Sequence, residues 1–342
     1  MRKLSLIATT VIAVGMFTSM ALWGMLVAFA STAGSGTSDT RTVTVPANVT
    51  VDELVAVLHE EGLVERKDWL QVYLRHFYQP QIFKAGEYAL NGLMTPAEML
   101  DQLARGQVVT YTVTIAPGAR KADVVAELAQ NKIADKSALE AALGDEGRAN
   151  ALGLIMGYEG YLFPDAYNLP RGLDAYQVLE ILVKRGRDAV SEELLADAKK
   201  VGLDAHQLIT MASLIEADAV PSGERSMVAS VYHNRLAKGM KLDHPATVAY
   251  GLDKSATELT QADLQSDHVW NTYLHEGLPP TPIASPSLSS IVAAARPAKS
   301  DALYFAPRGE SQHMFCPDEE CHRIALERWR KENARKKRVL QR

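Results

Sequence analysis

Cysteine is scarce in this sequence of 342 residues, with Cys316 and Cys321 as its only two examples. Outside the cytoplasm, two cysteines this close together are expected to form a disulfide. Together with His313 and His322 they could instead bind a metal, but a zinc site needs four ligands at suitable geometry and no recognised zinc spacing is present. We therefore expect a disulfide, with no metal site and no cofactor.

Positive charge is also in short supply, because 36 Lys and Arg face 41 Asp and Glu, a formal net charge of −5. The segment 328–342 alone holds eight Lys or Arg and one acid, which leaves a balance near −12 for the rest of the chain. This distribution argues against nucleic acid as a partner. The basic tail, 328–342, is interpreted as a solvated terminal helix, and attraction to anionic lipid or wall polymer is the alternative.

Charged residues are absent from Leu4 to Ala30, a stretch preceded by Arg2 and Lys3. As a helix it would be about 40 Å long at roughly 1.5 Å per residue, enough to cross the hydrocarbon core of a bilayer. Ala28-Phe29-Ala30 resembles a signal-peptide cleavage site, but the length of the apolar stretch favours an uncleaved anchor over residues 1–30. Either interpretation places the chain after Ser31 on the outer side of the cytoplasmic membrane, with the anchor as a single pass.

A polar tether, 31–40, is followed by an internal repeat with an offset of 70 residues. Each copy reads as a strand, a turn and a helix, and the repeat aligns 42–45 with 112–115 and 54–58 with 124–128. Further elements are expected as a helix near 67–77, a strand at 86–90, and helices at 95–105, 174–187, 192–200, 204–219 and 224–239. Thr95 with Glu98, and Asp204 with Gln207, have the spacing of capping boxes. The pattern predicts an α+β protein whose second half is mainly helical with long loops.

The helix from Asp204 carries the residue of greatest interest, Glu216. Its apolar face is formed by Leu208, Ala212, Ile215 and Ala219, bordered by Met211. Glu216 follows Ala212 by four residues and therefore faces the core, where an unpaired charge is costly. One explanation is a partner, such as Arg225, Arg235 or a backbone amide. The other is a general acid whose pKa is raised by an apolar cleft. Periodicity alone does not choose between them.

A second catalytic carboxylate cannot be Asp218, because two residues correspond to roughly 200° around the helix. The candidates are Glu159, Asp165, Glu224 and Asp243. Two loops could wall a saccharide groove: 158–167, which holds four aromatic residues, and 277–282, which holds three prolines. A core-covering loop and a structural crossover are the respective alternatives.

Several separated motifs resemble one known family. Ala212–Glu216, followed by Glu224-Arg225 and Val228–Leu236, is similar to the core of the endolytic murein transglycosylases called MltG, the YceG-like family. The further matched motifs, in the family's order, are Glu159–Asp165, Thr247-Val248 with Tyr250-Gly251, Asn271–Tyr273, Gly277–Pro280, Pro282–Ala284, Pro297–Lys299, Leu303–Phe305 and His313. The resemblance covers nearly all of the chain after the tether.

The resemblance implies a function and a domain plan. Glu216 matches the family's catalytic glutamate, which acts as acid and then as base to cut the β-1,4 bond between MurNAc and GlcNAc, leaving a 1,6-anhydro-MurNAc end. The implied domains are a membrane anchor, a LysM-like module over 41–108 and a catalytic domain over 109–327. The implied partners are glycan strands of peptidoglycan and penicillin-binding peptidoglycan synthases. Within the matched motifs, the residues expected to bind substrate are Tyr161, Asn234, Thr247, Tyr250, Asn271 and Tyr273.

The sequence departs from the family in three places. Ala217-Asp218 replaces Lys-Glu after the catalytic glutamate, Pro245-Ala246 replaces Asp-Pro, and Pro117-Gly118-Ala119 replaces Glu-Gly-Trp. The two cysteines are no family signature either. Two alternatives therefore stay open. One is a glycosidase with two carboxylates, Glu216 with Glu159 or Asp243. The other is a non-catalytic envelope scaffold that binds glycan and recruits synthases.

Overall fold

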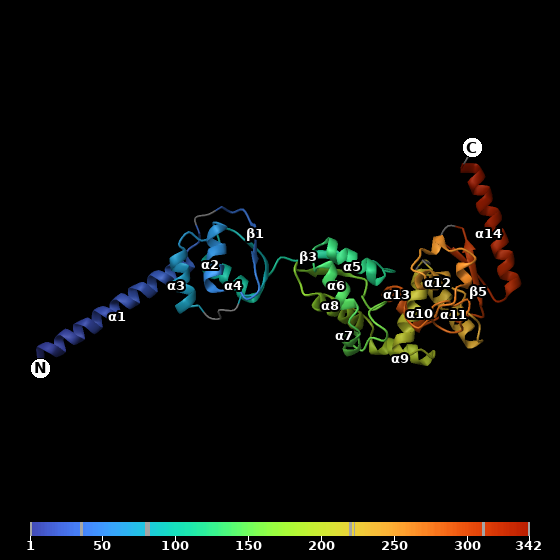
Figure 1. Cartoon of the computed structure of the whole chain (residues 1–342), viewed down its shortest axis with the longest axis horizontal. Coiled ribbons are helices and arrows are strands. Elements are labelled where there is room, and N and C mark those ends of the chain that lie inside the picture. Colours follow the sequence, from blue (N-terminus) through green and yellow to red (C-terminus); the bar gives the residue numbers. More distant parts are fainter. Residues whose placement is uncertain are drawn as a thin grey trace. The chain divides into compact units, whose positions relative to one another are not determined.

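The protein is a mixture of helices and small two-stranded sheets, as the sequence pattern predicts. The computed structural model describes residues 2–34, 37–78, 83–218, 221, 223–309 and 312–340, with side chains described from 10 to 335. Its helices (Figure 1) are α1 (Arg2–Ser31), α2 (Val51–Glu60), α3 (Lys67–His76), α4 (Pro96–Arg105), α5 (Lys121–Gln130), α6 (Lys136–Leu143), α7 (Glu146–Ala151), α8 (Ala175–Ala189), α9 (Glu192–Lys200), α10 (Ala205–Ala217), α11 (Arg225–Ala237), α12 (Pro245–Gly251), α13 (Leu288–Ala295) and α14 (Glu319–Leu340). Its strands are β1 (Arg41–Val45), β2 (Gly86–Leu90), β3 (Tyr111–Thr114), β4 (Ala166–Leu169), β5 (Tyr304–Arg308) and β6 (Gln312–Cys316).

The chain divides into two compact units. The N-terminal unit comprises Met1–Tyr111 with Asn168–Gly172, and the C-terminal unit comprises Thr112–Tyr167 with Leu173–Arg342. In the N-terminal unit β1 and β2 pair antiparallel, with Val43 opposite Tyr88. Alternate residues of both strands are buried against α2, α3 and α4. The order from β1 to β2 is therefore strand, helix, helix, strand.

The capping signals read from the sequence are confirmed in both units. The Thr95 side chain accepts a hydrogen bond from the Glu98 amide, and the Glu98 carboxylate accepts one from the Thr95 amide. The helix that starts there, α4, ends at Gly106, whose φ of 70° favours glycine. Asp204 and Gln207 form the same reciprocal pair at the start of α10.

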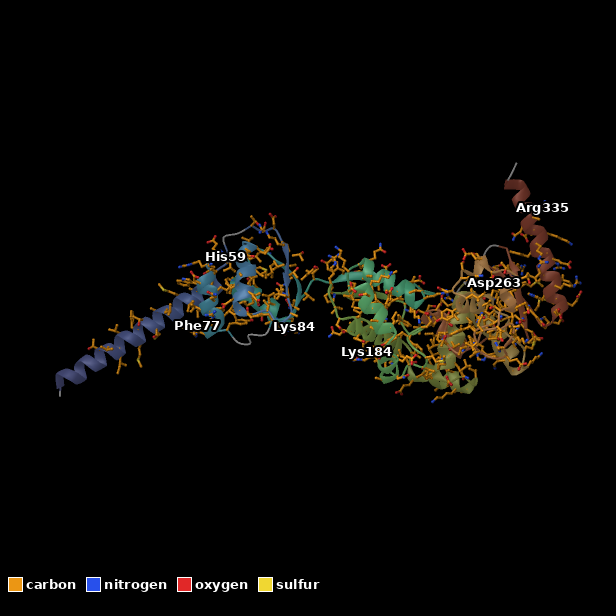
Figure 2. The ribbon with its side chains drawn as sticks, in the orientation of Figure 1. His59, Phe77, Lys84, Lys184, Asp263 and Arg335 are labelled. Carbon is orange, nitrogen blue, oxygen red and sulfur yellow. A yellow bond between two sulfur atoms is a disulfide. The ribbon has the colours of Figure 1, made fainter. Side chains whose placement is uncertain are left out.

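Helix α1 contains the apolar segment expected to be an anchor. Thr10–Ser31 is long and apolar enough to cross a membrane, a test that a signal sequence also passes. Most of its large apolar side chains are exposed, and Figure 2 shows them projecting from the helix. Near its end Leu26 and Ala30 are buried, and the Phe29 ring meets Trp69 edge-on at 5.9 Å. The C-terminal end of α1 thus packs on the N-terminal unit, whereas its preceding turns expose an apolar surface.

The C-terminal unit contains the helix that carries Glu216. Both copies of the internal repeat fold as predicted. In the first copy β1 is followed by a turn and α2, and in the second copy β3 is followed by a turn and α5. Helix α10 packs against α13 and places Leu208, Ala212 and Ile215 in one buried cluster. Ala219, predicted to continue this apolar face, lies outside the described residues. The core beneath Glu216 is therefore built by two helices that are far apart in the sequence.

The C-terminal end of the chain confirms the expected disulfide. Strands β5 and β6 pair antiparallel, and Cys316 at the end of β6 is bonded to Cys321 in the first turns of α14, with their Cα atoms 5.6 Å apart. The disulfide uses both thiols, so they are not free to bind a metal as thiolates. The described part of the basic tail, up to Leu340, continues α14 as a helix.

Candidate active site

Glu216 lies in the last turn of α10, and its side chain is only 7% exposed. The two residues before it are fully buried, because this part of α10 packs against α13 and α11. The carboxylate therefore sits in a sheltered position and not on an open convex surface. A charge held there requires partners, and the structure provides them from two other segments.

The first set of partners comes from the N-terminus of α13. The Ser287 amide donates a hydrogen bond of 2.9 Å to Glu216 Oε2, and the Ser287 hydroxyl also contacts this oxygen. The Ser290 hydroxyl donates a third bond of 2.7 Å to the same oxygen. Ser287 is the N-cap of α13, so the carboxylate lies where the helix dipole favours negative charge. This arrangement holds one carboxylate oxygen in a fixed position.

The second partner is Arg225, at the start of α11. Its Nη2 atom lies 3.0 Å from Glu216 Oε1, and its Nη1 atom donates to the Ser289 hydroxyl at 2.5 Å. The Arg225 side chain is 16% exposed. The structure thus contains the ion pair, and also the backbone amide, that the sequence left as one explanation for an inward-facing Glu216.

A turn after β3 borders the carboxylate. Gly118 has a φ of 79°, and a Cβ built on it would lie 4.0 Å from Glu216 Cγ with no other described heavy atom within 4 Å. The Gly118 amide donates to the Ser285 carbonyl, and the Ser285 amide donates to the Ala119 carbonyl, each at 2.8 Å. These two bonds fix the turn beside the segment that leads to Ser287. The space next to Glu216 is therefore open at Gly118.

Two polar atoms near this site lack a partner in the described part of the chain. They are Nε of Arg225 and Oγ of Ser285, and both atoms are buried. Buried polar groups without hydrogen bonds are rare, because each costs roughly 1–3 kcal/mol. Their position beside Glu216 and the Gly118 turn suits a site that receives polar groups of a ligand.

Glu159 is the most unusual of the four candidate second carboxylates. It is 4% exposed, accepts a 3.0 Å bond from the Lys121 amide at the start of α5, and accepts a 3.2 Å bond from the Tyr250 hydroxyl. Burial raises the pKa of Glu159 to about 7, although the Lys121 amide, the Tyr250 hydroxyl and the nearby Arg120 act in the opposite direction. Glu159 therefore changes its protonation near neutral pH.

This raised pKa predicts a pH-dependent stability. Between the ordinary value of 4.5 and about 7, the folded chain keeps a proton on Glu159 that the unfolded chain has released. Stability is consequently lost as pH rises through this window, on the order of 3 kcal/mol in total at about 1.36 kcal/mol per unit. In Glu159→Gln the loss should disappear, as measured by hydrogen exchange of the α5 amides at pH values on either side of the window. Glu140→Gln, an exposed matched change, should keep the wild-type slope; an unchanged slope in Glu159→Gln would contradict the prediction.

The other three candidates are engaged elsewhere. Asp165 pairs with Arg185 at 2.6 Å, and Asp243 accepts from Arg235 at 3.2 Å. Glu224, the N-cap of α11, accepts from both the amide and the ring Nδ1 of His313.

Asp218 points into a separate buried group, as its place on α10 predicts. It lies 3.3 Å from His244 Nε2 and accepts a bond from the Tyr232 hydroxyl at 2.5 Å. Burial acts to lower the pKa of His244, but the Asp218 charge and hydrogen bonds outweigh burial and raise it. Asp218 therefore acts as the partner of His244 and is directed away from the Glu216 carboxylate.

The residues predicted to bind substrate fall into two groups. Thr247 and Asn271 are fully buried, and their side chains bond to the His244 carbonyl and to the Leu264 and Ser266 carbonyls respectively. Asn234 donates to the Ser300 and Ala302 carbonyls ahead of β5. Tyr161, Tyr250 and Tyr273 are half-buried. The hydroxyls of Tyr161 and Tyr250 are already bonded to His206 and Glu159, so the exposed parts of these two rings and the Tyr273 side chain are what remains for a ligand.

Comparison with known proteins places the chain in a family. The model of the YceG-like family matches residues 43–328, well over half of the chain. The chain belongs to the YceG-like family. The endolytic murein transglycosylase of Bacillus subtilis (strain 168) is 30% identical over 308 residues, which cover 85% of each chain. That of Streptococcus pneumoniae (strain D39) is 26% identical over 317 residues; they cover 82% of this chain and 57% of the relative, so this chain spans little more than half of that protein. A crystal structure described as a YceG-like protein of Listeria monocytogenes superposes with a TM-score of 0.57 at 28% identity, covering 84% of this chain and 99% of that one.

The two loops singled out in the sequence meet in this YceG-like chain. Gly160 has a φ of 82°, and a Cβ there would lie 2.2 Å from Cβ of Pro282, so only glycine allows this approach. His206 joins the same loops, because its ring Nδ1 contacts the Tyr161 hydroxyl and its Nε2 contacts the Pro280 carbonyl. Three of the four aromatic residues in 158–167 are buried: Tyr158, Phe163 and Tyr167. Most of this loop therefore covers the core.

Sequence reasoning missed Gly118, Ser287 and Ser290. A signal was present for Ser287, because Ser-Leu-Ser-Ser before an apolar run has the form of a helix N-terminus, which favours an anion. Nothing in the sequence indicated that this N-terminus meets Glu216, 71 residues earlier. Gly118 was named only within Pro117-Gly118-Ala119, where the sequence departs from the family's Glu-Gly-Trp.

Proposed function

We propose that this YceG-like chain is an endolytic peptidoglycan lytic transglycosylase. It cleaves the β-1,4 bond between MurNAc and GlcNAc within nascent glycan strands and leaves a 1,6-anhydro-MurNAc end. The observation that carries the proposal is the buried Glu216 carboxylate, held by Arg225, Ser287 and Ser290 beside an open glycine turn. The family membership and the murein transglycosylase relatives support the same activity.

One carboxylate suffices for this reaction because acid and base act in sequence. Protonated Glu216 gives its proton to the glycosidic oxygen as the bond from that oxygen to C1 of MurNAc breaks. The 6-hydroxyl of the same MurNAc then bonds to C1, and its proton returns to Glu216. No water is consumed, and Glu216 ends in its starting form. A hydrolase, in contrast, generally needs two carboxylates on either side of the bond.

Arg225 and the N-terminus of α13 suit the intermediate stage of this reaction, at which Glu216 has given up its proton. After the first proton transfer Glu216 is a carboxylate, and the ion pair with Arg225 and the bonds from Ser287 and Ser290 stabilise that charge.

The predicted substrate-binding residues differ in whether their side chains are still free to bind a sugar. We assign direct sugar contact to Tyr273 and to the ring of Tyr250; both side chains are half-buried, and the Tyr250 hydroxyl is already bonded to Glu159. Asn234, Thr247 and Asn271 have their polar groups bonded to the protein's own chain, so we assign them the positioning of the loops around the site. Tyr161, which bonds to His206, belongs to the loop contact described above.

The remaining domain assignments follow the same proposal. Residues 1–30 anchor the chain in the cytoplasmic membrane with the rest on the outer side, and the tether 31–40 precedes the first module. The strand-helix-helix-strand order of the N-terminal unit supports a LysM-like module over 41–108 that binds glycan. Residues 109–327 form the catalytic domain, and 328–342 form the basic tail. Penicillin-binding peptidoglycan synthases are the proposed partners, because the substrate is newly made strand.

The test is digestion of long purified glycan strands by the full chain. An endolytic enzyme shortens long strands into fragments of intermediate length before disaccharides accumulate, and mass spectrometry should find 1,6-anhydro-MurNAc at the new ends. Early release of disaccharides from strand termini would contradict the endolytic assignment. Intact strands would favour the non-catalytic scaffold.

The buried Glu159 favours a second candidate, a glycosidase that uses Glu159 and Glu216 together, because a carboxyl with a pKa of about 7 can act as an acid. Glu159→Gln separates the two candidates. The transglycosylase needs no second carboxylate, so this variant should keep anhydro-product formation within about tenfold of wild type. A loss comparable to that of a Glu216 variant would support the glycosidase.

A further inference from the structure

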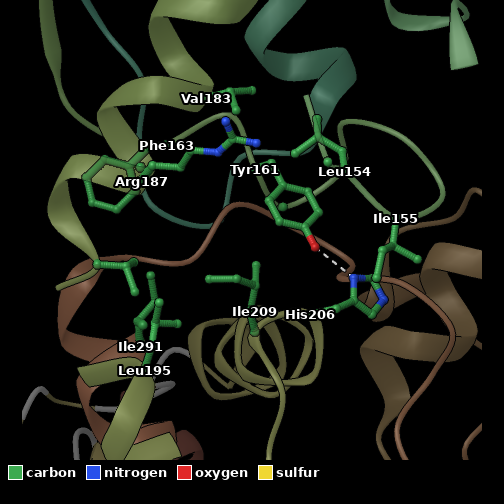
Figure 3. Close-up of a pocket in the computed structure, with 15 residues that line it drawn as sticks. Leu154, Ile155, Tyr161, Phe163, Val183, Arg187, Leu195, His206, Ile209 and Ile291 are labelled. Carbon is green, nitrogen blue, oxygen red and sulfur yellow. Dashed lines mark hydrogen bonds between the residues drawn. The ribbon is translucent and has the colours of Figure 1, made fainter. Parts of the chain in front are cut away.

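The C-terminal unit contains a cavity that the proposed reaction does not use. Its volume is about 320 Å³, at the lower end of the range of roughly 300–1,000 Å³ for small-molecule sites. It lies among the loop 153–163 and helices α8, α9, α10 and α13 (Figure 3). Along α10 the lining residue Ile209 is about 10 Å from Glu216 at roughly 1.5 Å per residue, and on α13 the lining residue Ile291 follows Ser290, which bonds to Glu216. We call it the Arg187 cavity, after the one charged side chain in its lining.

The two ends of the Arg187 cavity differ in chemistry. Figure 3 shows the Arg187 side chain reaching toward Tyr161 and Leu154, while Leu195 and Ile291 lie at the opposite end. Arg187 is exposed at the mouth of the cavity, and its guanidinium forms no hydrogen bond or ion pair with the residues that the structure describes. Arginine binds carboxylates through two parallel N–H bonds, so this end suits a carboxylate. The rest of the lining is mainly apolar, with the Phe163 ring beside aliphatic side chains.

The polar groups on the flank of the cavity are already satisfied. The Tyr161 hydroxyl lies 2.7 Å from His206 Nδ1, and His206 Nε2 lies 2.8 Å from the Pro280 carbonyl. Burial raises the pKa of Tyr161 to about 12, so its hydroxyl stays neutral and does not repel an anion. The nearest acid that acts on Tyr161 is Asp204, whose carboxylate caps the Gln207 amide.

This lining disfavours both the sugars and the peptides of peptidoglycan. Sugar hydroxyls and peptide amides would lose their bonds to water and find almost no partners among aliphatic side chains, at a cost of roughly 1–3 kcal/mol for each unpaired group. An apolar body with a single anionic group has no such cost, because its one polar group meets Arg187.

We propose that the Arg187 cavity binds a small apolar monocarboxylate, with the carboxylate on Arg187 and the apolar body among Leu195, Ile209 and Ile291. The ligand class covers short fatty acids and aromatic acids, which share this chemistry. The proposal is independent of glycan cleavage, so failure of either leaves the other standing.

The test uses the full chain in lipid nanodiscs, with empty nanodiscs to subtract partition into lipid. The probes are 4-phenylbutyrate, octanoate, the alcohol 4-phenylbutan-1-ol, which lacks the charge, and butyrate, which lacks the apolar body. Saturation-transfer NMR titration should show that one or both of the first two bind at least about tenfold more tightly than the alcohol or butyrate. The stronger of the two identifies whether the body is aromatic or aliphatic.

Variants of the chain locate the binding. Arg187→Gln should weaken acid binding about tenfold or more and leave alcohol binding unchanged. Lys184→Gln removes the same charge from α8 outside the cavity, at the position labelled in Figure 2, and should bind as wild type does. Leu195→Trp should fill the cavity and weaken acid and alcohol alike, with hydrogen exchange of α8 and α9 unchanged. The proposal is overturned if wild-type binding of both acids equals that of empty nanodiscs, if Arg187→Gln binds as Lys184→Gln does, or if correctly folded Leu195→Trp binds normally.

Discussion

Glu216→Gln should lower the rate of glycan cleavage by at least about 10³-fold while the fold is retained. General acid–base catalysis by one positioned group contributes roughly 10²–10⁴-fold, and here the same group acts in both proton transfers. Glutamine has the same shape, and its carbonyl oxygen still accepts bonds from the Ser287 amide and the Ser290 hydroxyl. Its NH2 group then faces Arg225 and loses that ion pair, so the fold of the variant is measured together with its activity. The measurement is the rate of anhydro-muropeptide release by the full chain.

The matched control for this variant is Glu140→Gln, an exposed carboxylate on α6 with a partner, Lys136, at 3.7 Å. It should cleave at the wild-type rate. Circular dichroism and hydrogen exchange of α10 establish whether each variant is folded. Retained cleavage by folded Glu216→Gln would remove this residue from the mechanism and leave the family resemblance without its proposed acid.

Arg225→Leu should destabilise the C-terminal unit by about 3 kcal/mol. It leaves the Glu216 carboxylate buried without its charge partner, a change that typically costs roughly 3–5 kcal/mol. The lower end is expected here because Ser287 and Ser290 continue to donate. In the double variant Glu216→Gln/Arg225→Leu no charge remains, so most of this loss should be recovered. The measurement is the opening free energy of the α10 amides by hydrogen exchange in all four chains of the cycle.

Arg185→Leu provides the comparison for that cycle. Arg185 also pairs with a carboxylate, Asp165, but the two side chains are 48% and 34% exposed. Exposed pairs contribute about 1 kcal/mol or less, so the cost of this change should be small. Equal losses in Arg185→Leu and Arg225→Leu, or additive effects in the Glu216 and Arg225 cycle, would show that the buried pair is not coupled as described.

Local sequence signals predicted the elements of this fold well. The reciprocal spacing of Thr95 with Glu98 and of Asp204 with Gln207 located two helix starts, because a capping box depends only on residues within one turn. The inward direction of Glu216, and the placement of Asp218 on a different side of the helix, followed from helical periodicity. These features are set by neighbours in the chain, so a sequence displays them directly.

Long-range contacts could not be derived in this way. The sequence left open whether Glu216 has polar partners or lies in an apolar cleft. Two of its partners, Ser287 and Ser290, are brought to it by the packing of α13 against α10. The asymmetry of the Arg187 cavity arises from four helices and a loop, none of which carries a recognisable motif alone.

Cleavage in water labelled with heavy oxygen tests the central claim most directly. In the proposed reaction the 6-hydroxyl of MurNAc bonds to C1 and gives its proton to Glu216, so the new ends form without water. Mass spectrometry should then find anhydro products free of the label. New reducing ends, heavier by one water and carrying one labelled oxygen, would contradict the account and indicate hydrolysis by two carboxylates.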